Sequence, residues 1–131
     1  MTNADPILVR DWIALQHAAE GSEERERLLD THDRVSDLVL EQPESAWCFV
    51  LEALRIDSST AVKETLSAGP LEDLLAQHGP LVVDRIEKQA RLSPEFASLL
   101  GGVWKSSITD EVWERVQKVW DRRGWDGIPA A

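Results

Sequence analysis

Apolar residues recur along most of the chain at spacings of three and four, the period of an α-helix that lies on a core. No stretch alternates apolar and polar residues convincingly, as a half-buried strand would. The pattern therefore predicts an all-α protein of about eight short helices joined by short connectors. We expect residues 1–131 to form a single domain, in which antiparallel helical hairpins stack like a short helical-repeat array.

Capping residues, prolines and glycines mark where these helices begin and end. The third predicted helix is apolar on nearly every side and is expected in the middle of the fold. Trp125 is expected to fold back over the last predicted helix. The predicted helices run from Asp5-Pro6 to Gly21, about Glu23 to Glu41, Pro43 through Leu54, about Ser59 to Ser67, Pro70 over two turns, Pro80 through Ala90, Pro94 to Gly101, and Thr109 to Gly124.

Composition supports a folded protein that has a substantial core. Apolar residues make up 43% of the chain and include six tryptophans. The single cysteine, Cys48, excludes an intrachain disulfide and a multi-cysteine metal site, and we expect it to be a small core residue. The first residues lack the pattern of a secretory signal and no stretch is long and apolar enough to span a bilayer, so we expect a cytoplasmic protein.

Charge is high and unevenly distributed. The net charge of −10 argues against nucleic acid or an anionic membrane as a direct partner. Residues 1–57 carry thirteen acids and five bases, whereas residues 58–131 carry eleven acids and nine bases. Helical spacing places five acids of the second predicted helix in one stripe, opposite its apolar face: Glu26, Asp30, Asp33, Asp37 and Glu41. The stripe is either an ordinary solvated face or a docking surface for a basic protein partner.

The stretch AGPLEDLLAQHGPLVVDRIEKQA, residues 68–90, crowds glycines, acids and a histidine together. A phosphate cradle needs several converging N–H groups, but proline follows each glycine here and removes one of them. We therefore interpret Gly69 as the residue that ends one helix and Pro70 as the first turn of the next. The pair Gly79-Pro80 is expected to repeat this arrangement. Farther along, Asp84 and Lys88 are spaced for an i,i+4 ion pair.

Three polar side chains of this stretch are the alternative candidate site. Glu72 and Asp73 occupy a predicted first helical turn, where carboxylates are stabilising, and His78 continues the apolar face of the same helix. Together they are candidates for lining a small-molecule pocket. His32 is expected on the apolar face of the second helix. The chain has no nucleophile motif and no metal-binding histidine pair, so we expect no cofactor. A non-enzymatic protein is favoured, and an enzyme stays open as an alternative.

The motifs LSAGPLEDLLAQHG, SPEFASLLGGVW and PESAWCFVLEAL resemble those of an uncharacterised bacterial family of small proteins. The resemblance extends over roughly Ile7 to Trp125. Because that family is one of unknown function, the resemblance implies a helical fold and a bacterial cytoplasmic setting and supplies no catalytic residue.

Three functions remain open at this point. The leading hypothesis is a non-enzymatic interaction protein, such as an immunity protein or inhibitor whose acidic stripe occludes a basic toxin or enzyme. The second is a helical scaffold or regulatory module that binds a peptide in a groove between hairpins. The third is a small-molecule binder or enzyme with a pocket around His78.

Overall fold

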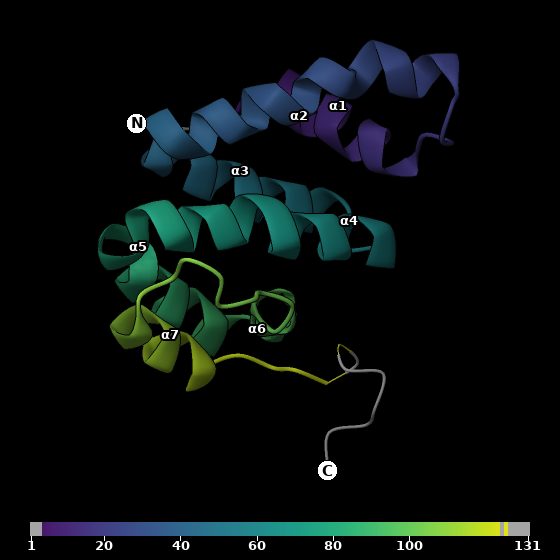
Figure 1. Ribbon diagram of the computed structural model, residues 1–131. Helices are drawn as coiled ribbons and strands as arrows, with labels where there is room; N and C mark the ends of the chain where they lie inside the picture. The colour runs from purple at the N-terminus through teal and green to yellow at the C-terminus, as the bar shows by residue number, and fades with distance from the viewer. Residues whose placement is uncertain (1–3, 124, 126–131) are drawn as a thin grey trace.

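The computed structural model describes residues 4–123 and residue 125, and every regular element among them is a helix. Figure 1 shows these helices in layers: α1 and α2 lie at one end, α3 comes next, α4 and α5 follow, and α6 and α7 lie at the other end. The predicted all-α fold is confirmed for this part of the chain. Gly124, the predicted end of the last helix, lies outside the described residues, but that helix already ends at Gln117, earlier than predicted.

The first layer is a hairpin of α1 (Pro6–His17) and α2 (Glu23–Glu41). As predicted, Asp5 caps α1: its carboxylate accepts a hydrogen bond from the N–H of Ile7 at 2.9 Å. The α1 helix ends earlier than predicted, and Gly21 lies in the turn with a φ of 79°. Glycine adopts this left-handed conformation without the cost that a side chain would bring.

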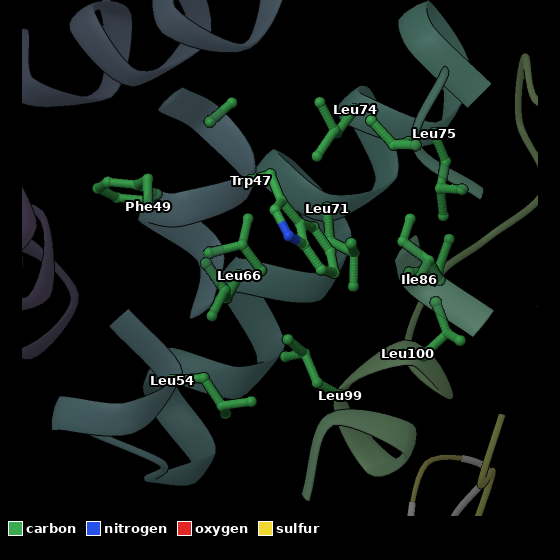
Figure 2. Close-up of a cluster of buried hydrophobic side chains, with 14 of the residues drawn as sticks. Trp47, Phe49, Leu54, Leu66, Leu71, Leu74, Leu75, Ile86, Leu99 and Leu100 are labelled. Carbon is green, nitrogen blue, oxygen red and sulfur yellow. The ribbon is translucent and has the colours of Figure 1, made fainter. Parts of the chain in front are cut away.

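The central position predicted for the third helix is confirmed. Helix α3 (Pro43–Ile56) packs against α1, α2, α4 and α5. Trp47 meets Phe96 of α6 edge to face, with ring centroids 5.5 Å apart, and Phe49 meets Trp12 of α1 in the same way. Figure 2 shows Trp47 surrounded by leucines of the following helices, so one core joins the layers.

The next layer contains a helical run that continues through the predicted boundary at Gly69-Pro70. Helix α4 (Thr60–Leu66) continues through a π-helical turn, η1 (Ser67–Leu71), into α5 (Glu72–Leu92). At His78, where φ is −133°, the backbone leaves helical geometry and α5 divides into two segments. This break comes directly before Gly79-Pro80, where a helix boundary was predicted. The described residues thus form seven α-helices and one π-helix, and the predicted eight separate helices in stacked hairpins are not confirmed.

The last layer consists of α6 (Pro94–Leu100) and α7 (Asp110–Gln117), which start at the predicted caps Ser93 and Thr109. Arg115 of α7 pairs with both Asp84 and Glu87 of α5. The predicted ion pair between Asp84 and Lys88 is therefore wrong, because the arginine from the neighbouring helix takes the carboxylate.

After α7 the chain returns across the end of α6. The N–H of Asp121 donates to the carbonyl of Ala97 at 2.9 Å, and the Trp125 indole donates to the carbonyl of Ser98 at 2.6 Å. Trp125 therefore folds back as expected, but it packs on α6 rather than on the last helix. A Cβ atom at Gly101 would lie only 2.0 Å from the Asp121 carbonyl oxygen, so this close approach requires a glycine.

Candidate functional site

The acidic stripe lies where helical spacing places it. Its five carboxylate residues are all exposed: Glu26, Asp30, Asp33, Asp37 and Glu41. The opposite side of α2 packs on the core through Leu28, Thr31, Val35 and Val39. At 1.5 Å per residue, the stripe is about 22 Å long.

None of the five carboxylates forms an ion pair or a side-chain hydrogen bond with the residues that the structure describes. Arg27 and Arg34 lie on the same helix, and within the same set of residues they too form no ion pair. Carboxylates one helical turn apart repel one another by a few tenths of a kcal/mol per pair in water. The stripe is therefore a surface whose negative charge is not neutralised from within the described fold.

Apolar and polar side chains border the stripe on one flank. Leu29 and Leu40 are exposed by 53% and 57%. The prediction for His32 is wrong, because Thr31 takes the buried position and is only 2% exposed, whereas His32 lies exposed at the edge. Helical periodicity did not reveal these two leucines, because it identifies the buried face of a helix and not apolar residues outside that face.

The AGPLEDLL segment forms no helix boundary. Gly69 and Pro70 lie inside η1, and Gly69 does not have the positive φ that a helix-ending glycine needs. Because the helix runs on without a free N-terminus, Glu72 and Asp73 have no unpaired helical N–H groups to stabilise. The predicted helix-start role of these two acids is wrong.

His78, Glu72 and Asp73 point to three different places. The His78 Nε2 atom lies 2.9 Å from the carbonyl oxygen of Val39 and 3.1 Å from that of Leu40. These carbonyls belong to the last turn of α2, where helical carbonyls lack intrahelical donors, so His78 caps α2. Since carbonyl oxygens only accept, Nε2 carries the hydrogen.

Glu72 instead holds the loop between α6 and α7. Its carboxylate accepts hydrogen bonds from the N–H of Trp104 at 2.9 Å and from the Ser106 hydroxyl at 3.1 Å. These bonds fix a loop in which Ser106 has a φ of 40° and Trp104 is 69% exposed. The roles of Glu72 and His78 are therefore accounted for by contacts within the fold.

Asp73 lines a cavity of about 30 Å³ between α1, α2 and η1, which is room for a single water. Neither Glu72 nor His78 lines it, so the three predicted pocket residues do not converge. Partial burial raises the pKa of the Asp73 carboxyl, and the charge of Glu72 raises it further, while nearby His32 lowers it.

We expect Asp73→Asn to stabilise the protein at neutral pH. At a pH above the raised pKa, Asp73 is a charged carboxylate in the folded state. Partial burial disfavours this charge, and the amide of asparagine does not carry it. The melting temperature at pH 7 should rise by roughly 1–3 °C. The gain should shrink as the pH falls and should vanish well below about 3.9, where Asp73 is largely protonated in both states. Exposed Glu114→Gln serves as the control and should give no such pH-dependent difference.

A groove of about 670 Å³ runs along α3. It is mostly apolar, and its lining comes from the start of α1, from α3, from the end of α5 and from α6: Ala4, Pro6, Cys48, Leu51, Glu52, Leu54, Arg55, Ile56, Gln89, Ser93, Glu95 and Phe96. Cys48 is half-buried at this groove, so its predicted place in the core is wrong. The groove joins segments far apart in the sequence, and no single motif could have revealed it.

Within the described residues no group of three or more histidine, cysteine or acidic side chains is placed to hold a metal ion. No helix in the same set is long and apolar enough to cross a membrane.

The sequence profile of a family of unknown function, DUF6869, matches residues 18–124. The chain belongs to the DUF6869 family. The match takes in α2, α3, η1 and the loop after α6, and so it includes the stripe, the His78 cap and the Glu72 anchor of this DUF6869 protein. No curated protein and no solved structure matches it.

Proposed function

We propose that this DUF6869 protein is a non-enzymatic binding protein whose acidic stripe docks on the basic surface of a protein partner. The observation that supports the proposal is the stripe itself, with five exposed carboxylates on one helix that lack ion-pair partners among the described residues. A cation-rich partner would relieve their mutual repulsion and would be steered toward them over a distance of about a Debye length.

Leu29 and Leu40 add the apolar contact area that charge alone does not supply. Rim charges mainly accelerate association, whereas desolvated apolar side chains slow dissociation. A surface with both fits a specific complex better than a solubilising face does. In the more specific form of the proposal the protein is an immunity protein or inhibitor, and α2 occludes the basic substrate cleft of a toxin or enzyme.

Reversing three charges of the stripe should slow complex formation. The partner would first be captured from the native cells with the wild-type protein and then purified. Asp30→Lys, Asp33→Lys and Asp37→Lys together should lower its association rate constant by about 10-fold or more at low salt. They should also flatten the salt dependence of that rate, measured by stopped-flow mixing.

The matched control reverses three exposed acids that lie apart from the stripe: Glu20→Lys, Glu64→Lys and Glu114→Lys. Both variants have the same net charge, so the control separates the local surface from the overall charge. Equal association rates in the two triple variants would contradict the proposal, as would a captured partner that is itself acidic at the contact.

A second candidate function is peptide binding in the α3 groove, which is favoured by its apolar lining and by Ile56 at its edge, 53% exposed. The same capture experiment separates the two functions. If the Ile56→Asp variant fails to capture the partner and the stripe-reversal variant still captures it, the binding site is the groove instead.

A further inference from the structure

The outer side of α5 carries an exposed row of two leucines and two bases. We call Leu81, Arg85, Lys88 and Leu92 the α5 seam. Its leucines are exposed by 54% and 71%, the latter being the highest value among the exposed large hydrophobic residues described. The opposite side of the same helix is buried through Val82, Val83, Ile86 and Ala90. The α5 seam therefore points away from the core.

The outer side of α2 carries a row with the same spacing. We call Leu29, Asp33, Ser36 and Leu40 the α2 seam; all four residues are exposed. In both seams successive residues are four, three and four positions apart. This is the heptad spacing, which places side chains in a row along one face of a helix, where they can contact a second helix. Each leucine pair is eleven residues apart, about 16 Å along the axis.

The polar residues between the leucines have opposite charges in the two seams. The α5 seam has Arg85 and Lys88, whereas the α2 seam has Asp33, with Asp37 of the acidic stripe beside it. Leucines facing leucines would therefore bring bases opposite acids. The two seams do not cover each other within one chain, because their leucines and charged residues are exposed; Ser36 alone also borders the small cavity beside Asp73.

We propose that the α2 seam of one copy of this protein docks along the α5 seam of a second copy. The inference rests on the proposed function, because it treats α2 as a docking surface. It adds a way in which partner binding is regulated. Self-association covers part of the acidic stripe and so competes with the basic partner.

The existing contacts of the seams are compatible with this docking. Arg85 pairs with Glu44, but both side chains are about half exposed, and exchanging partners in such a surface pair costs little. Lys88 forms no ion pair with the described residues. His78 holds the last turn of α2, which carries Leu40, so this end of the α2 seam is fixed in place.

A contact of about three helical turns on each side is small, and we expect weak self-association, with a dissociation constant on the order of 0.1 mM. Sedimentation equilibrium of the purified full-length protein, from about 10 µM to 1 mM, should show the average mass rising with concentration. Leu29→Gln with Leu40→Gln should weaken the association about 10-fold or more, and Leu81→Gln with Leu92→Gln should do the same.

Mixing the two double variants provides the decisive measurement. The first retains an intact α5 seam and the second an intact α2 seam, so together they should associate again at concentrations where each alone is mostly monomeric. A charge exchange tests the same pairing: Asp33→Arg with Asp37→Arg should weaken association, and mixing this variant with Arg85→Glu, Lys88→Glu should restore it. All substituted residues are exposed, and unchanged melting temperatures would show that the variants fold.

Three results would overturn the inference: a wild-type protein that is monomeric throughout, self-association that survives both leucine variants, or no restoration on mixing. These results come from the purified protein alone and leave the partner-binding proposal standing. Conversely, normal partner rates in the stripe-reversal variant would reject that proposal without affecting the measured self-association.

Discussion

Replacing Gly101 with alanine is expected to destabilise the protein by about 2–3 kcal/mol. The new Cβ atom would lie 2.0 Å from the Asp121 carbonyl oxygen and 2.7 Å from its carbonyl carbon. Both atoms are backbone, so no side-chain rotation relieves the overlap. The segment after α7 must lift, and it then loses the bond from Asp121 to Ala97 and that from Trp125 to Ser98.

The measurement is the free energy of unfolding in urea, combined with the fluorescence of Trp125 as its indole leaves α6. Gly69→Ala is the matched control, since nothing lies within 4 Å of a Cβ atom there and its φ is not positive. Alanine at that helical position should be neutral or stabilising by up to about 1 kcal/mol. Equal stability of the two variants would show that the returning segment does not lie against Gly101.

Replacing Trp47 with alanine should have the largest effect on stability, a loss of about 3–5 kcal/mol. Trp47 is 8% exposed and joins the central helix to Phe96 of α6 through their edge-to-face contact. Its removal leaves a cavity among the leucines that Figure 2 shows around it, and these side chains close in only partly. Because the loss is a large fraction of the stability of a small domain, Trp47→Phe should give a smaller, measurable loss in the same direction.

Trp104→Ala supplies the comparison, since it removes the same side chain from a position that is 69% exposed. Its unfolding free energy should change by less than about 0.5 kcal/mol. Both variants lose one indole, so their tryptophan content is equal. Thermal unfolding followed by circular dichroism then compares their stability. A loss as large for Trp104 as for Trp47 would contradict the layered packing around α3.

The helix starts were predictable because the signals are local. Asp5, Ser93 and Thr109 each accept a bond from an N–H two or three residues later, and a fixed spacing of this kind can be read from a short stretch. The outward face of α2 was predictable for the same reason. The central place of α3 followed from its nearly continuous apolar surface.

The candidate site was harder to predict because it depends on contacts across the fold. Gly69-Pro70 has the sequence of a helix end, yet packing of Pro70 and Leu71 in the core favours a π-turn that lets the helix continue. His78 looked like a core or pocket residue, but its partners are backbone carbonyls 38 and 39 residues earlier. A hydrogen bond from a side chain to a backbone carbonyl far away in the sequence cannot be predicted from the pattern of side chains along the chain.

The π-turn η1 also fixes the rotational register of everything that follows it. Each residue turns an α-helix by about 100°, so deleting one residue between Ser67 and Leu71 would rotate the start of α5 by that amount about its axis. Leu74 and Leu75, both buried, would turn out of the core, and His78 would swing away from the end of α2. This segment therefore accepts a substitution at Gly69 far more readily than a change of length, and the bond that caps the acidic helix α2 depends on the number of residues in η1.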